Sequence, residues 1–129
     1  MAEKYDSKLA AEFVMRCFHA RTAAHVLHLK STGPGSFAEH KALNEFYDGI
    51  VDLIDGFAEM YQGEYLELLP MSGMSGYQTP TSAMALISGM TKWIKSNREQ
   101  ICDSSECQNV VDEILSLCHS TAYKLKFLK

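Results

Sequence analysis

The stretch that decides the fold is residues 36–62, which read SFAEHKALNEFYDGIVDLIDGFAEMYQ. Its large apolar side chains recur every three or four residues, and at about 100° per residue they fall within about 100° of arc. They are Leu43, Phe46, Ile50, Leu53, Ile54, Phe57 and Tyr61. Ser36 and Glu39 have the spacing of a capping box, so we expect Ser36 to cap an amphipathic helix over 37–62.

Three further segments have the pattern of helices. An apolar stripe runs through 7–29, and the glycines and proline of 31–35 should end that helix. Prolines and glycines make 64–80 an irregular connection, after which a third helix is expected over 81–101. A fourth helix should follow an interruption at 102–105, where Asp103, Ser104 or Ser105 would cap it. Four helices with one longer loop in the middle predict a single all-α domain over 1–129, a four-helix bundle.

Composition narrows the classes of function. A net charge of −4 disfavours a dedicated nucleic-acid binder, and no apolar run approaches the length of a membrane span. The four cysteines, Cys17, Cys102, Cys107 and Cys118, show no CxxC spacing. A chain of this size needs no disulfides, so we expect four buried free thiols in a soluble protein of the cytoplasm.

The polar side of the helix expected at 37–62 carries residue types that bind transition metals. Imidazole nitrogen and carboxylate oxygen suit such ions, and His40, Asp55 and Glu59 offer them, with His28 just before the turn. If His40 is set at 0° on the helical wheel, Asn44 falls near 40°, Asp55 near 60° and Glu59 near 100°. These positions average some 140° from the centre of the apolar stripe. A metal site built from them would therefore lie between subunits, where another surface faces this helix.

The residues around this turn and along the helix that follows it resemble those of a known family, the Dps miniferritins. The resemblance rests on His28 to His40, HLKSTGPGSFAEH, followed by Asn44, Asp55 and Glu59. In those proteins a histidine ends the first helix, and a loop with glycine and phenylalanine leads into a second helix that opens with another histidine. An Asp-x-x-x-Glu pair follows. The matching stretch covers under a third of the chain.

The resemblance implies a ferritin-like bundle with a ferroxidase site shared between two subunits. His28 and His40 of one subunit would face Asp55 and Glu59 of its two-fold mate, and these four residues would be the metal ligands. Iron would be bound as Fe(II) and oxidised by peroxide or oxygen. The implied partner is the chain itself, as a homodimer or a larger assembly such as a hollow shell of twelve subunits. We expect neither a membrane nor a nucleic acid as partner.

Two departures from the family leave an alternative open. Asn44 stands where the family has an aspartate, so one charged ligand is lost and Asn44 would only contact metal-bound water. Leu29 stands where the family has an aromatic residue. The alternative is a ferritin-like helical protein that has lost the metal chemistry and serves as an assembly or interaction module. Its acidic face would then be an interface or plain surface, formed by Asp48, Asp52, Asp55 and Glu59.

Overall fold

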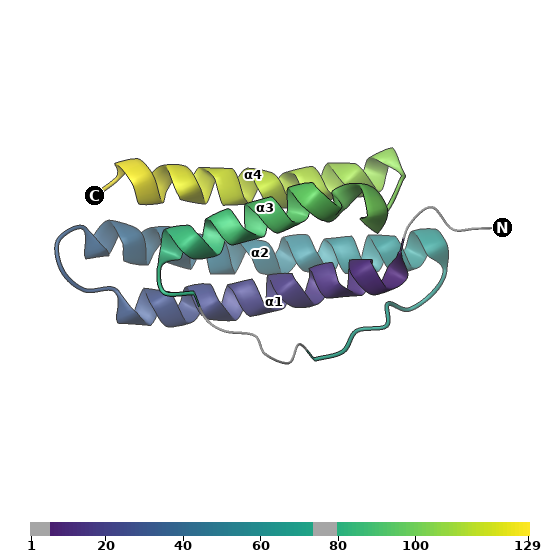
Figure 1. Ribbon diagram of the computed structural model, residues 1–129, viewed down its shortest axis with the longest axis horizontal. Helices are drawn as coiled ribbons and strands as arrows, with labels where there is room; N and C mark the ends of the chain where they lie inside the picture. The colour runs from purple at the N-terminus through teal and green to yellow at the C-terminus, as the bar shows by residue number, and fades with distance from the viewer. Residues whose placement is uncertain (1–5, 74–79) are drawn as a thin grey trace.

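The protein is a four-helix bundle. The computed structural model describes residues 6–73 and 80–129. Its helices are α1 (Ser7–Lys30), α2 (Ser36–Tyr65), α3 (Ala83–Ile101) and α4 (Ser105–Phe127) (Figure 1). No strand lies within these two ranges. The all-α prediction is confirmed.

The order of the helices explains the long connection in the middle of the chain. The closest packing is of α1 against α2 and α3, and of α4 against the same two helices, so α2 and α3 lie on a diagonal. In Figure 1 these two helices run in the same direction. The end of α2 and the start of α3 therefore lie at opposite ends of the bundle, so a short turn cannot connect them.

The apolar face of α2 forms the centre of the core. Six of its predicted side chains are at most 1% exposed, and only Leu53 of the set is half-buried. The six are Leu43, Phe46, Ile50, Ile54, Phe57 and Tyr61. From α1, Phe13 packs edge-on against Phe57 at 4.9 Å between ring centroids, and it stacks with Trp93 of α3 at 6.1 Å. Each fully buried phenylalanine of this kind contributes about 2–3 kcal/mol of burial free energy.

The start of α2 differs from the prediction. Ser36 is the first residue of the helix, and the cap is Gly35, which takes the left-handed conformation at φ 79° and makes no side-chain cap bond. Glu39 does not close a capping box. Its carboxylate instead accepts a hydrogen bond of 3.0 Å from the hydroxyl of Ser31. The capping-box prediction is wrong because the left-handed glycine turns the chain one residue earlier than a serine cap would.

The connection between α3 and α4 corrects a second prediction. Cys102 and Cys107 form a disulfide, and both are fully buried, whereas Cys17 and Cys118 are buried free thiols as expected. The prediction of four free thiols is therefore wrong for Cys102 and Cys107, because the tight turn brings Cys102, the residue that follows α3, beside the first turn of α4. The cytoplasmic localisation stays a prediction, since two of the thiols on which it rested are oxidised.

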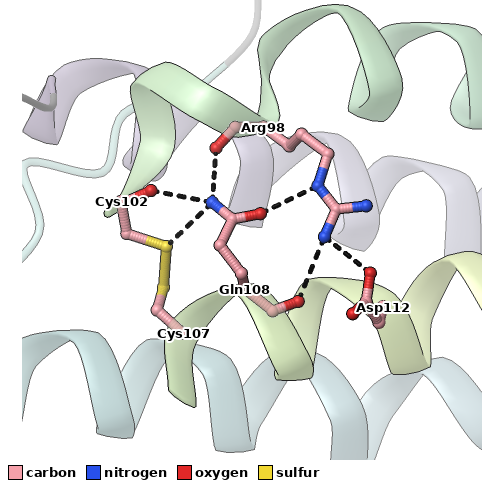
Figure 2. Close-up of polar contacts among 5 residues, drawn as sticks. All are labelled: Arg98, Cys102, Cys107, Gln108 and Asp112. Carbon is pink, nitrogen blue, oxygen red and sulfur yellow. Dashed lines mark hydrogen bonds and ion pairs between the residues drawn. A yellow bond between two sulfur atoms is a disulfide. The ribbon is translucent and has the colours of Figure 1, made fainter. Parts of the chain in front are cut away.

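Polar bonds reinforce this turn. Figure 2 shows the Gln108 side chain between the disulfide and Arg98. Its Nε2 donates to the carbonyl oxygens of Arg98 and Cys102, each at 2.7 Å, which the C-terminus of α3 leaves without helical partners. Arg98 in turn donates to Gln108 Oε1 at 2.8 Å and forms an ion pair with Asp112 at 2.6 Å. At the next helix start Ser104, one of the three expected caps, accepts from the backbone N–H of Cys107.

Within the described ranges, no helix combines the length and the apolar character that crossing a membrane demands.

Replacing both Cys102 and Cys107 with alanine tests the contribution of the disulfide. The bond closes a loop with a sequence separation of only 5, and for so short a loop the chain-entropy model gives about 2 kcal/mol. We expect the free energy of unfolding to fall by that amount, measured by urea unfolding followed by circular dichroism. A reductant should lower the stability of the natural protein similarly and leave the double variant unchanged. Equal stability of the two proteins without reductant would contradict this role.

Candidate metal centre

His28 and His40 lie face to face across the turn that joins α1 to α2. Their ring centroids are 3.5 Å apart and the ring planes differ by 21°. His28 is in the last turn of α1 and only 8% exposed, while His40 is half-buried in the second turn of α2. Because the two helices are antiparallel and the turn is short, residues separated by twelve positions in sequence become direct neighbours.

Each of the two rings hydrogen bonds to the backbone of the other residue. His28 Nδ1 lies 2.7 Å from the carbonyl oxygen of His40, and His40 Nδ1 lies 2.9 Å from the carbonyl oxygen of His28. A carbonyl oxygen only accepts, so Nδ1 carries the proton in both rings. The neutral rings then have their lone pair on Nε2. Histidine ligands of metals are commonly held in this way, with one ring nitrogen donating to a backbone carbonyl and the other left to bind.

Tyr47 packs beside this histidine pair. Its ring stacks on His25 at 4.3 Å and meets His28 edge-on at 5.3 Å. Tyr47 was not among the residues predicted for this site, although it lies seven residues after His40 and hence on the same side of α2. The tyrosine therefore joins both helices at the level of the histidines.

The amide of Asn44 is held in a fixed orientation. Its Oδ1 accepts a hydrogen bond of 2.7 Å from the Tyr47 hydroxyl, and its Nδ2 donates to Asp48 at 2.9 Å. Asn44 thus belongs to a chain of hydrogen bonds along α2. It brings no charge to the histidines.

A pocket of about 320 Å³ opens beside the two histidines. Its lining residues are His28, Phe37, His40, Lys41, Asn44 and Glu45. Lys41 Nζ lies 5.9 Å from the centre of the exposed Phe37 ring. Glu45 forms an ion pair with Lys124 of α4, and the hydrogen bond and charge of Lys124 lower the pKa of Glu45. The pocket therefore contains imidazole, amide and aromatic groups together with charges of both signs.

The other two predicted ligands lie elsewhere on the same helix. Asp55 and Glu59 are exposed, as the helical wheel predicts, and within 6–73 and 80–129 neither side chain forms a hydrogen bond or ion pair. At 1.5 Å per residue they lie about 22 Å and 28 Å along α2 from His40. In the described part of a single chain, no three His, Cys, Asp or Glu side chains come together to hold a metal ion. A site shared between subunits stays a prediction.

The chain matches a known protein family. The model of the family of unknown function DUF5856 matches residues 28–125, which is most of the chain and includes all four predicted ligands. The chain belongs to this family. No curated protein and no solved structure matches it. The DUF5856 match begins at His28 and ends near the close of α4, so it covers the histidine pair, α2 and α3, but only the last three residues of α1.

For this DUF5856 member we expect the contact between Glu45 and Lys124 to make stability depend on pH. Lys124 lowers the pKa of Glu45 from its ordinary value of 4.5. A carboxyl group with a lowered pKa stabilises the fold at pH values above its ordinary pKa. That contribution is lost as the pH falls through the lowered pKa. Glu45→Gln should therefore be slightly less stable than the natural protein near neutral pH, and the two should converge in acid.

Urea unfolding at several pH values and low salt measures this difference. An exposed pair contributes at most about 1 kcal/mol, so the effect should be small and should weaken with added salt. Glu99→Gln serves as the control, because Glu99 is exposed and forms no ion pair within the described residues. A difference that persists unchanged at acid pH would contradict the assignment to Glu45.

Proposed function

We propose that two copies of this chain bind Fe(II) at shared sites and oxidise it. Each site takes His28 and His40 from one copy and Asp55 and Glu59 from the other. The observation that carries the proposal is the pair of Nδ1 hydrogen bonds to the backbone carbonyls of the facing histidines. These bonds direct the lone pair to Nε2 in both rings, which is the form that binds a metal.

The layout of α2 supports the pairing with a second copy. In an antiparallel two-fold contact, His40 of one helix meets Asp55 and Glu59 of the other when the axis passes beside residues 48 and 49. This point is close to the middle of α2, which spans Ser36–Tyr65, so the two helices would overlap along nearly all of their length.

The chemistry treats iron as the substrate. Imidazole nitrogens and carboxylate oxygens bind Fe(II), and the negative carboxylates favour the more highly charged Fe(III) product. With hydrogen peroxide as the oxidant, two Fe(II) ions each give up one electron, and the peroxide takes both electrons and two protons to form two water molecules. Because each site takes ligands from two copies of the chain, oxidation requires that the copies assemble.

Anaerobic titration with Fe(II), followed by addition of hydrogen peroxide, tests the proposal. We expect stoichiometric binding and then the absorbance of Fe(III) in the natural protein. Both should be lost in the Asp55→Ala, Glu59→Ala double variant, because the carboxylate half of the site is gone. Asp52→Ala is the matched control, an exposed acid on the same helix that the site does not use. Natural protein that assembles but neither binds nor oxidises iron would overturn the proposal in favour of an assembly module without metal chemistry.

Mixing two inactive variants tests whether the site is shared. One variant lacks His28 and His40, and the other lacks Asp55 and Glu59, so neither alone should bind iron. After dissociation and random reassociation of a two-fold dimer, about a quarter of the sites should contain all four ligands. Light scattering should show a dimer or a larger assembly. A monomer, or a mixture without any restored binding, would contradict a site between subunits.

A further inference from the structure

One end of the bundle exposes large apolar side chains among lysines. It contains the turn between α1 and α2 and the last turns of α4, which lie at the same end of the molecule in Figure 1. We call it the lysine end and define it as residues 29–41 and 123–129. We infer that the lysine end binds the surface of a lipid bilayer that contains anionic lipids. This contact is independent of the proposed iron chemistry.

Packing brings the two ranges of the lysine end together. A Cβ atom on Gly35 would lie 3.5 Å from that of Lys129. A pocket of about 220 Å³ between the ranges is lined by Thr32 and Ser36 of the turn and by Leu128 of the other range. The turn and the end of α4 therefore form one surface.

Exposed apolar side chains are concentrated at this end. Within the described residues nine large apolar side chains are exposed, and five of them belong to the lysine end. These five are Leu29, Phe37, Tyr123, Phe127 and Leu128. Side chains of this kind scattered singly are ordinary, whereas a group of them at one place marks an interaction surface.

The solvent side of α4 changes from polar to aromatic over its last turns. The residues that this helix buries are Cys107, Val111, Ile114, Leu115, Cys118 and Thr121. At about 100° per residue, Tyr123 and Phe127 lie roughly 140° and 180° from Cys118 and so point away from the core. Their side chains are 55% and 68% exposed, and the two rings lie 5.8 Å apart. Ser116 and Ser120 occupy the same side of the helix in the preceding turns.

The charge of the lysine end is opposite to that of the whole chain. Its two ranges hold five lysines and one acid, Glu39, and so carry a net charge of +4, whereas the chain carries −4. Lys124 is paired with Glu45 of α2. The other four lysines, all exposed, are Lys30, Lys41, Lys126 and Lys129. An anionic surface therefore attracts this end and repels the rest of the molecule, which orients the protein.

The combination of projecting rings and lysines fits a bilayer surface. Helices that bind there place aromatic and leucine side chains among the lipid headgroups, while lysines meet the anionic lipids. Tyr123 and Phe127 do not line the pocket at this end, so they project from α4 toward a partner that can adapt to them. A nucleic-acid duplex would contact the lysines through its phosphates and leave Leu128 in water.

A contact of this kind differs from a membrane span. The sequence-based expectation of no membrane partner rested on the lack of an apolar run of spanning length. Binding at a surface needs no such run, because the apolar side chains enter only about 5–10 Å into the bilayer.

Cosedimentation of the full chain with vesicles tests the inference. One set of vesicles contains phosphatidylcholine alone, and the other contains equal parts of phosphatidylcholine and phosphatidylserine. Each lysine near an anionic surface adds about fivefold in affinity, so binding to the anionic set should be at least about tenfold tighter than to the neutral set. Added salt should weaken this binding, because it screens exposed charges.

Two double variants separate the charged from the apolar contribution. Lys126→Gln, Lys129→Gln should weaken binding to the anionic vesicles at least about tenfold and reduce its dependence on salt. Tyr123→Ser, Phe127→Ser should weaken it by a similar factor and leave the dependence on salt unchanged, because only apolar contact is lost.

The matched controls carry the same substitutions elsewhere. Lys92→Gln, Lys95→Gln removes two exposed lysines of α3 outside the lysine end. Leu66→Ser, Leu68→Ser removes two leucines that are 87% and 82% exposed beyond the far end of α2. Both controls should bind the anionic vesicles as tightly as the natural protein does.

The inference is overturned by equal binding to the two sets of vesicles, or by binding to neither. Unchanged binding in either variant of the lysine end, or an equal loss in its control, would also overturn it. A gel shift of duplex DNA by natural protein that ignores both sets of vesicles would assign this end to nucleic acid instead. Circular dichroism of each variant establishes that a loss of binding does not arise from unfolding.

Discussion

The burial of one narrow face of α2 is the constraint on which the rest of the structure depends. This helix packs against both α1 and α4, and its apolar side chains are almost completely shielded from water. Rotating the helix would bring polar groups into the core at the cost of their hydration. The opposite face, with Asp55 and Glu59, is therefore held outward. Any chemistry of these carboxylates must involve solvent or a second molecule, and the interior of the bundle is excluded.

The histidine pair depends on the end of one helix and the start of the next. The His28 carbonyl belongs to the last turn of α1, whose oxygens lack a full set of helical partners. The His40 ring donates to this oxygen, and the His28 ring does the same for the backbone of α2. The hydrogen bonds that the two backbone carbonyl oxygens accept at the turn thus also set the tautomer of both rings. The bonds that stabilise the turn are therefore the same ones that fix the tautomer of the two rings.

The two ends of the bundle are stabilised in different ways. At the α3–α4 end the disulfide and Gln108 join the helices, and Ser104 donates to Glu64 of α2 at 2.8 Å. At the opposite end, a glycine-containing turn and the exposed ion pair between Glu45 and Lys124 hold the helices around the pocket. Exposed ion pairs contribute little and are weakened by salt. At this end the two hydrogen bonds between the His28 and His40 rings and the backbone join α1 to α2.

The sequence by itself determined the four helices, the buried face of α2, the outward direction of its acids and the long connection before α3. These follow from a period of 3.6 residues and from proline and glycine, which act locally. Only the tertiary structure decided that Gly35 rather than Ser36 caps α2, that Cys102 joins Cys107, and that His28 stacks on His40. Each of these depends on the backbone path through a turn and on distances between separate helices. The role of Tyr47 belongs to the same group, because its contacts span α1 and α2. Periodicity shows which side of a helix a residue is on, but only packing shows what that side meets.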